Sequence, residues 1–161
     1  MIAFRRLFSV FFLVLAVFPF LPLNAQTGAA QAEEELSMLN NLSYELVKDI
    51  VTGKSGYRSV LVSPLTFSNR IVPFGEMYAY KASSYLAERL GSNFSIFRQT
   101  EATTGNYDLL LTGSVFTVAE SYMCLLQVID GSTGAVLKGR DVTLASSQVL
   151  TALITAGSAG G

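Results

Sequence analysis

The sequence predicts a mixed α/β domain in which helices pack against a central mixed sheet of about five strands. Two segments place apolar residues at three- and four-residue spacing, as amphipathic helices do, and a short apolar run follows each of them. Three longer strand-like runs, separated by short polar turns, fill the last third of the chain. This order predicts one parallel strand–helix–strand crossover followed by an antiparallel three-strand meander.

The first helix is predicted to begin at Glu33. Glu33, Glu34 and Glu35 favour its first turn through the helix dipole, and Gly53 suits its end. One face of this helix carries the apolar residues Leu39, Leu42, Leu46, Val47, Ile50 and Val51.

The crossover is predicted around residues 59–98. Residues 59–65 (SVLVSPL) are apolar and β-branched, which is typical of a buried strand, and Pro64 marks its end. A loop is expected over 66–75, then a helix from Glu76 that Gly91 ends, then a second short strand, FSIFRQ.

The meander is predicted from the runs at 108–120, 121–130 and 135–144. The middle run is apolar on both of its alternating faces, so we expect it inside a sheet that is covered on both sides. The third run alternates Lys138 and Arg140 with Leu137 and Gly139. One of its faces should therefore be wet, as on an outer strand.

The N-terminal segment 1–25 has the pattern of a signal peptide: Arg5 and Arg6, an apolar run from Leu7 to Phe18, and Ala25 before the expected cut. A retained anchor helix is the alternative, although Pro19 and Pro22 interrupt the run. No cysteine follows the run, so a lipoprotein anchor is not expected and any membrane association would be indirect. The other predicted parts are a flexible leader (26–32), a single domain (33–145), and a short helix with a small-residue tail (146–161).

Composition excludes several classes of function. Without residues 1–25 the chain has nine basic and twelve acidic side chains, a net charge of about −3, which does not favour nucleic acid. There is no histidine, so the usual general base and the commonest zinc ligand are missing. Cys124 is the sole cysteine and is expected to be buried. We expect no cofactor, no metal and no enzymatic activity.

Two glycine-containing segments resemble phosphate-binding loops. Residues 129–141 read IDGSTGAVLKGRD, but they lie between two predicted strands, where a glycine-containing hairpin turn is expected. Gly53-Lys54-Ser55 lacks the first glycine of a P-loop and follows a helix rather than a strand. Both are interpreted as turns.

An envelope enzyme that depends on carboxylates is the remaining catalytic alternative. Glu76 and Glu88 lie too far apart on one helix to share a site, and Asp108 stands at a strand end, where acids normally cap backbone amides.

The loop after the first strand is the candidate partner-binding site. Phe67, Asn69, Arg70 and Phe74 follow the carboxyl end of that strand, where open α/β sheets bind ligands and partners. The alternative is that Phe67 and Phe74 belong to the core, which leaves Asn69 and Arg70 exposed.

Several segments together resemble a known family. VLVSPLTFSN, SSYLAERLGSNFSIFRQT, YDLLLTGSVF and LLQVIDGSTGAVLKGRD are similar to the FlgO-type domain, which is related to the TolB N-terminal-like domain and more distantly to CsgG and LpoB. The resemblance covers about residues 59–144. The chain departs from it in lacking the lipid-bearing cysteine and any counterpart of the CsgG membrane hairpins. The connection 100–106 is also too short for the extra helix of some relatives.

The resemblance implies a non-enzymatic protein of the bacterial envelope, in the periplasm or at the periplasmic face of the outer membrane. Such a protein would bind protein partners and support the assembly of an envelope machine such as the flagellum. The alternatives are a structural oligomer subunit, a regulator of cell-wall synthesis and the carboxylate-dependent enzyme.

Overall fold

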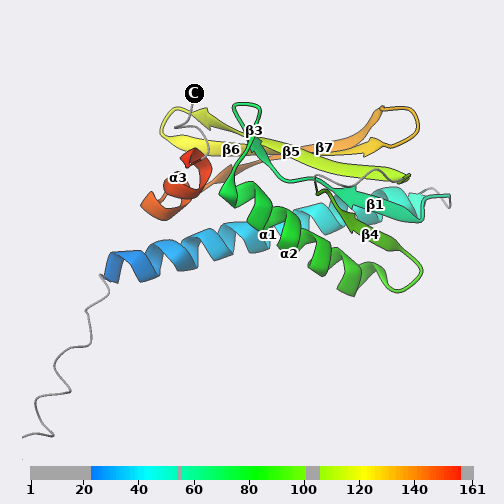
Figure 1. The fold of residues 1–161 in the computed structure, drawn as a ribbon, viewed down its shortest axis with the longest axis horizontal. Coiled ribbons are helices and arrows are strands. Elements are labelled where there is room, and N and C mark those ends of the chain that lie inside the picture. The colour runs from blue at the N-terminus through cyan, green and yellow to red at the C-terminus, as the bar shows by residue number, and fades with distance from the viewer. Residues whose placement is uncertain (1–22, 54–55, 101–105, 157–161) are drawn as a thin grey trace, which may run out of the picture.

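The protein is described by a computed structural model that covers residues 23–53, 56–100 and 106–156 of the 161. One sheet forms a layer, and the three helices all lie on the same side of it (Figure 1). In chain order the elements are α1 (Leu23–Gly53), β1 (Ser59–Val62), β2 (Thr66–Phe67), β3 (Arg70–Ile71), α2 (Pro73–Leu90), β4 (Ser95–Arg98), β5 (Leu109–Val118), β6 (Ser121–Asp130), β7 (Val136–Leu144) and α3 (Gln148–Thr155).

The sheet is mixed, as predicted. β1 pairs in parallel with β4 on one side and with the first part of β5 on the other, so that Val60 lies between Ile96 and Leu109. β5, β6 and β7 form the predicted antiparallel meander. Beyond β1, the second part of β5 pairs with β2, which pairs with β3. The described sheet is therefore five strands wide both at the first half of β5 and at its second half.

Two short strands were not predicted. Residues 66–75 were expected to be a loop, but β2 and β3 form a hairpin whose turn residues Ser68 and Asn69 have φ angles of 51° and 61°. Such a left-handed pair makes a tight two-residue turn, and asparagine tolerates this conformation better than most residues. The Thr66 and Ser114 hydroxyls, 3.1 Å apart, add a side-chain hydrogen bond between this hairpin and β5.

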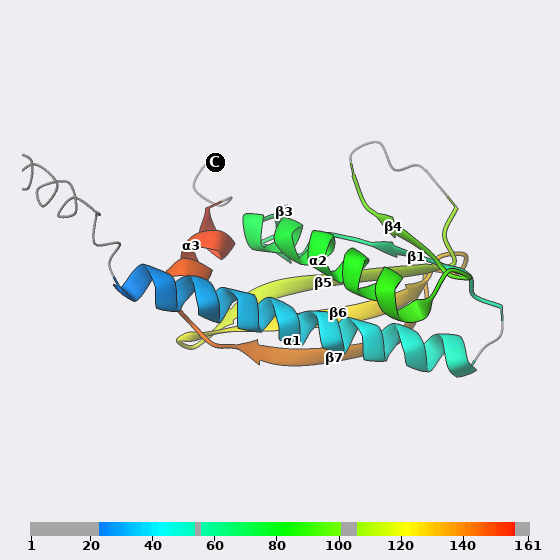
Figure 2. The same cartoon turned by 90° about the horizontal axis from the view of Figure 1, so that it is seen from below.

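The first helix is longer than predicted. It begins at Leu23 rather than at Glu33, so residues 26–32, which were expected to be a flexible leader, are part of the helix. The cause is α3, which packs against this part of α1 (Figure 2). The approach is close at Gly28, where an added Cβ would lie 2.6 Å from Val149 Cγ2. Residues 1–22, which hold most of the predicted signal peptide, lie outside the described residues.

The second helix also begins early, at Pro73 instead of Glu76. Proline suits the first helical position because its fixed φ is helical and its missing N–H has no helical partner there. Gly91, with φ 80°, follows the last residue of the helix as predicted.

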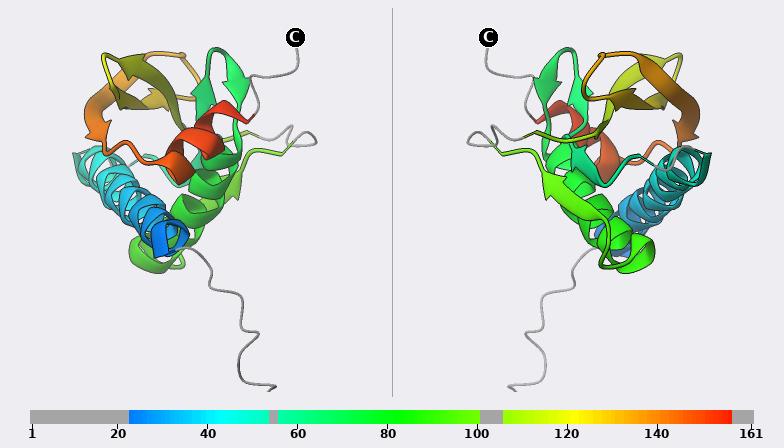
Figure 3. Two further views of the ribbon diagram at one scale, coloured as in Figure 1. Left: turned by 90° about the vertical axis from the view of Figure 1, so that its left-hand side faces the viewer. Right: turned by 90° about the vertical axis from the view of Figure 1, so that its right-hand side faces the viewer.

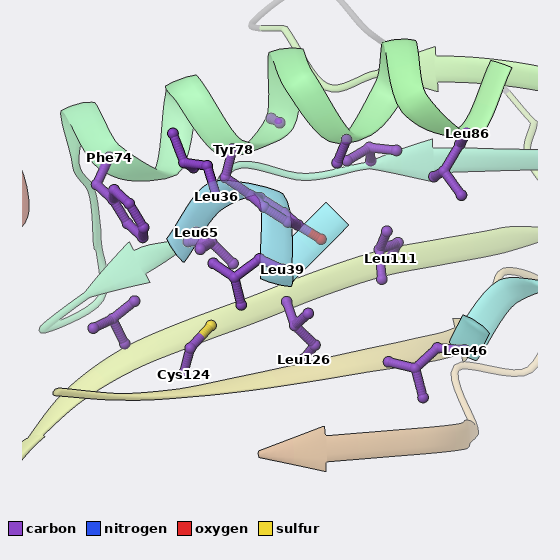
Figure 4. Close-up of a cluster of buried hydrophobic side chains, with 14 of the residues drawn as sticks. Leu36, Leu39, Leu46, Leu65, Phe74, Tyr78, Leu86, Leu111, Cys124 and Leu126 are labelled. Carbon is purple, nitrogen blue, oxygen red and sulfur yellow. The ribbon is translucent and has the colours of Figure 1, made fainter. Parts of the chain in front are cut away.

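The core lies between the helices and the sheet (Figure 4). Leu36 and Leu39 of α1 face Leu111 and Leu126 of the sheet, and all four side chains are fully buried. The Tyr78 hydroxyl of α2 is buried with them and lies 2.7 Å from Ser43 Oγ, which donates to Leu39 O. Burial raises the pKa of Tyr78, so the phenol stays neutral and links α1 to α2 inside the core.

The face of the sheet opposite the helices has no covering element among the described residues (Figure 3). We predicted cover on both sides because β6 is apolar on both faces. Tyr122, Cys124, Leu126 and Val128 are buried under the helices, but Met123, Leu125 and Ile129 are only half-buried on the other face. The prediction of a two-sided cover is therefore wrong.

In the described part of the chain, no helix combines the length and the apolar character needed to cross a bilayer.

Candidate functional site: the open face of the sheet

We name the uncovered side of the sheet the open face. It is formed mainly by the alternate side chains of β5 and β6 that point away from the helices, and none of these ten side chains is charged. They are Leu110, Thr112, Ser114, Phe116 and Val118 on β5, and Ser121, Met123, Leu125, Gln127 and Ile129 on β6.

Exposed apolar side chains gather on the open face. Six large apolar residues of the described chain are exposed, and only Tyr80, on α2, lies among the helices. The strand register places the other five on the open face, because each is aligned with one of its outward positions. These are Ile71 (52% exposed), Phe97 (45%), Phe116 (39%), Val118 (44%) and Val136 (55%). Since scattered single apolar residues are normal on a surface but clusters mark interaction sites, the concentration on one face is informative.

The open face has two apolar bands with a more polar strip between them. The proximal band runs across the five strands as Phe97, Leu61, Leu110, Ile129 and Val136. Phe97 and Val136 are exposed, Leu110 and Ile129 are half-buried, and Leu61 is buried between its neighbours. The distal band consists of Phe116, Val118 and Met123 at the other end of β5 and β6. The strip between the bands holds Thr112, Gln127, Ser114 and Leu125, so hydroxyl and amide groups lie at its centre beside one leucine. Ile71 of β3 and Asp141 of β7 are aligned with the two edges of this strip.

The four residues of the predicted partner-binding loop are not brought together. Phe74 is fully buried in the core, and Phe67 is half-buried with its ring edge-on to Tyr122 at 6.2 Å between centroids. Asn69 and Arg70 are exposed at the hairpin, as the alternative interpretation expected. Their role in partner binding remains a prediction.

The glycine-containing segment after β6 is a turn. Asp130 N donates to Ala135 O at 2.9 Å, and Gly134 N donates to Asp130 O at 2.8 Å, which joins β6 to β7. Asp130 Oδ1 accepts bonds from the backbone N–H groups of Ser132 and Thr133 and from the Ser132 hydroxyl. The donors of the turn are therefore directed at the protein's own carboxylate. The other similar segment includes residues 54–55, which lie outside the described residues.

The Asp130 carboxylate stabilises this turn to an extent that depends on pH. The Ser132 hydroxyl, then the Tyr57 hydroxyl, which donates to Oδ2 at 2.7 Å, hold the pKa of Asp130 below its usual range. A carboxyl whose pKa is lowered by folding stabilises the fold above its unfolded pKa, about 3.9, and that contribution disappears as the pH falls through the folded pKa.

We therefore expect Asp130→Asn to lower the Tm near neutral pH and to matter less in acid. Asparagine keeps one acceptor but loses the charge, so the Tm difference from the parent protein should shrink as the pH falls below about 4. Thermal melts followed by circular dichroism across this range measure it. Asp141→Asn, an exposed change on β7, is the control. An Asp130→Asn deficit that stays constant with pH would show that the charge is not involved.

The face of the outer strand β7 that carries Lys138 and Arg140 is solvent-exposed, as predicted. These two basic residues contact α1. Lys138 forms an ion pair with Asp49, and Arg140 Nη1 lies 3.8 Å from Glu45 Oε2. All four side chains are largely solvent-exposed, so these pairs orient α1 along the sheet edge but add little stability.

The carboxylates do not form a catalytic pair. Asp108 Oδ2 accepts bonds from Arg58 N at 2.7 Å and from the Ser59 hydroxyl at 2.9 Å, which fixes the start of β1. Glu35 is buried, a position that the sequence did not reveal, and burial raises its pKa. Its Oε1 accepts from Ala145 N at 2.9 Å, so Glu35 ties α1 to the segment that leads into α3.

A groove of about 430 Å³ lies at the carboxyl ends of β1 and β4, beside α2. Open α/β sheets usually bind ligands at the carboxyl ends of their strands, so this groove is where a ligand would be expected. Glu76 is the single carboxylate in its described lining, and the Arg98 guanidinium lies over the exposed Tyr80 ring at 5.3 Å. One carboxylate does not supply an acid and base pair. The lining comprises Pro64, Glu76, Ala79, Arg98, Gln99 and Thr100.

Neither a metal site nor a reactive thiol appears in the described part of the chain. No group of three potential acidic, cysteine or histidine ligands occurs there. Cys124 is buried on β6, as expected, and burial raises the pKa of its thiol to about 12.

These features define a mixed α/β domain with one helical layer and one open sheet face. No model of a known protein family matches the sequence, and no curated protein matches it significantly.

Solved structures with a distantly similar fold come from bacterial proteins. The LpoB C-terminal domain from Escherichia coli has 12% identity and a TM-score of 0.42, over 65% of this chain and 98% of that domain. The lipoprotein GNA1162 from Neisseria meningitidis has 16% identity and a TM-score of 0.38, over 61% of this chain and 91% of that one. TolB from Acinetobacter baumannii has 12% identity and a TM-score of 0.35, over 63% of this chain and 25% of that one.

LpoB and TolB are thus among the structures with this distant likeness, whereas the FlgO-type assignment remains a prediction. At these scores the likeness does not support an argument about function. The argument about function rests on the open face itself.

Proposed function

We propose that this chain is an exported, non-enzymatic protein of the bacterial envelope that binds a protein partner through its open face. The observation that carries the proposal is the open face: five of six exposed large apolar residues lie on it, and the outward side chains of its two central strands are uncharged. Covering such a surface removes apolar area from water at little electrostatic cost. The predicted signal peptide supports the periplasm, or the periplasmic face of the outer membrane, as the location.

The finer part of the proposal comes from the sequence. The FlgO-type segments support a role in assembling an envelope machine such as the flagellum. The alternative function, regulation of cell-wall synthesis, would use the same kind of surface. The two functions differ in which protein binds it. The carboxylate-dependent enzyme is disfavoured because Asp108 caps β1 and Glu76 has no second carboxylate beside it in the described groove.

Photo-crosslinking in intact bacteria tests the function. A photoreactive phenylalanine analogue is placed at Phe116 on the open face and, as a matched control, at Tyr80 on α2, since both aromatic side chains are exposed. After illumination, cells are separated into cytoplasmic, periplasmic and membrane fractions. The expected result is an adduct with an envelope protein from position 116, in the periplasmic or membrane fraction, and none from position 80.

Two outcomes would contradict the proposal. One is a chain that remains in the cytoplasm with its N-terminal segment intact. The other is equal crosslinking from both positions, because this would show that the open face is no more engaged than the helical layer.

A further inference from the structure

We infer that the open face binds a second copy of this chain, giving a two-fold dimer in which two sheets pack face to face. This inference rests on the proposed function, because it names a partner for the same surface. The argument depends on the symmetry of the pattern, on its charge and on its size.

The pattern of the open face is self-complementary. An apolar band lies at each end, and the strip with Thr112, Ser114 and Gln127 lies between them. A two-fold axis in the plane of the interface maps this face onto itself. Whether the axis runs along the strands or across them, apolar bands meet apolar bands and the hydroxyl and amide groups meet one another. Two-fold interfaces need this property, whereas a binding site for an unrelated protein does not.

The charge of the open face also suits a second copy. Identical surfaces repel each other when they carry like charges, and specific pairs of different proteins commonly use opposite charges. The outward side chains of β5 and β6 carry none, and Asp141 is the one acidic residue aligned with them from β7. Because β7 is an edge strand of the described sheet, Asp141 lies at the rim, where its carboxylate can stay hydrated.

The size of the open face meets the lower requirement for a stable dimer. Five strands about 4.8 Å apart and ten residues at about 3.4 Å span about 24 by 34 Å, or roughly 600 Å² once the short strands are allowed for. Two copies would bury about 1,200 Å², which is the lower end of the range for specific protein interfaces. Aligned twisted sheets pack in this way in β-sandwiches. We therefore expect a dimer that dissociates in the micromolar range.

Sedimentation of the purified mature protein over a concentration series tests the inference. The parent protein is expected to shift from monomer to dimer as concentration rises. Phe116→Lys, which puts a charge into the distal band, should weaken dimerisation by about tenfold or more. Tyr80→Lys, the matched change on α2, should leave it unchanged. A parent protein that stays monomeric into the high micromolar range overturns the inference.

Thiol crosslinking provides a second readout that does not depend on how well Phe116→Lys folds. Ser114→Cys places a thiol at the centre of the open face, and Ser84→Cys places one on the exposed side of α2. The native Cys124 is buried, so it does not compete for the reagent. With a bismaleimide that spans about 10 Å, the spacing of packed sheets, dimers are expected from Ser114→Cys and not from Ser84→Cys. Equal crosslinking of the two variants contradicts the inference.

The two proposals fail in different ways. A monomeric protein whose position 116 captures a different envelope protein in cells refutes the dimer and supports the proposed function. A dimer whose position 116 captures only this chain supports the inference and removes the open face as the site of a different partner.

Discussion

Replacing Gly75 with alanine is expected to destabilise the protein by about 3 kcal/mol or more. Gly75 lies in the first turn of α2, where the helix passes directly over the backbone of Leu65, which follows β1. A Cβ added there would lie 2.1 Å from Leu65 O and 2.7 Å from Leu65 N. These are backbone atoms, so the clash is relieved only by lifting α2 from the sheet.

Gly53→Ala is the matched control for Gly75→Ala. Gly53 is the last residue of α1, and an added Cβ would meet nothing within 4 Å. Alanine also favours the helix more than glycine does, so the free energy of unfolding should stay within about 1 kcal/mol of the parent value. Urea unfolding followed by circular dichroism measures both. If the two variants unfold at the same urea concentration, α2 does not approach Leu65 as closely as described.

The second large effect is expected at Phe74. This side chain is fully buried among Leu65, Tyr78 and the inner face of the sheet, so Phe74→Ala should leave a cavity and cost about 3–5 kcal/mol. Phe67→Ala should cost only about 1–2 kcal/mol, because its ring is half-buried and water can reach the space it leaves.

This pair of variants also tests the two interpretations of the segment after β1. In the structure Phe74 is a core residue, so any partner contact made by this segment would have to rely on the exposed Asn69 and Arg70. The measurement is again the free energy of unfolding in urea. A Phe74→Ala protein as stable as Phe67→Ala would place Phe74 at the surface and restore it as a candidate contact.

The helices and long strands could be predicted because their signals are local. The spacing of Leu39, Leu46 and Val47 requires one buried helical face, and Gly91 ends α2 as glycine usually does. The Asp130 turn was also predictable, since a short glycine-containing segment between two apolar runs rarely does anything else.

Other features depend on distant contacts and could not be predicted. The start of α1 is packed by α3, which lies more than a hundred residues later in the chain. β2 and β3 have two residues each and are recognisable only through their pairing with β5. Nothing local marks Glu35 as buried, because its bond to Ala145 is made by the fold.

The open face was visible in the sequence, but its meaning was not. Met123, Leu125 and Ile129 gave β6 a second apolar side, and an apolar side is usually assigned to the interior. The structure shows that the helices of the described chain all lie on the other side of the sheet, so none of them covers this face (Figure 3). The same signal can therefore indicate an internal layer or an intermolecular one.

The position of Cys124 has a consequence if the chain is exported, as proposed. In the folded protein this thiol is buried at the centre of β6 and its raised pKa keeps it protonated, so oxidants and thiol exchange cannot reach it. In an oxidising compartment, the unfolded chain would expose the same residue to disulfide-forming enzymes. As the only cysteine, it would then form mixed disulfides with other proteins. In such a compartment, whether Cys124 is oxidised would depend on whether the sheet folds before oxidation occurs.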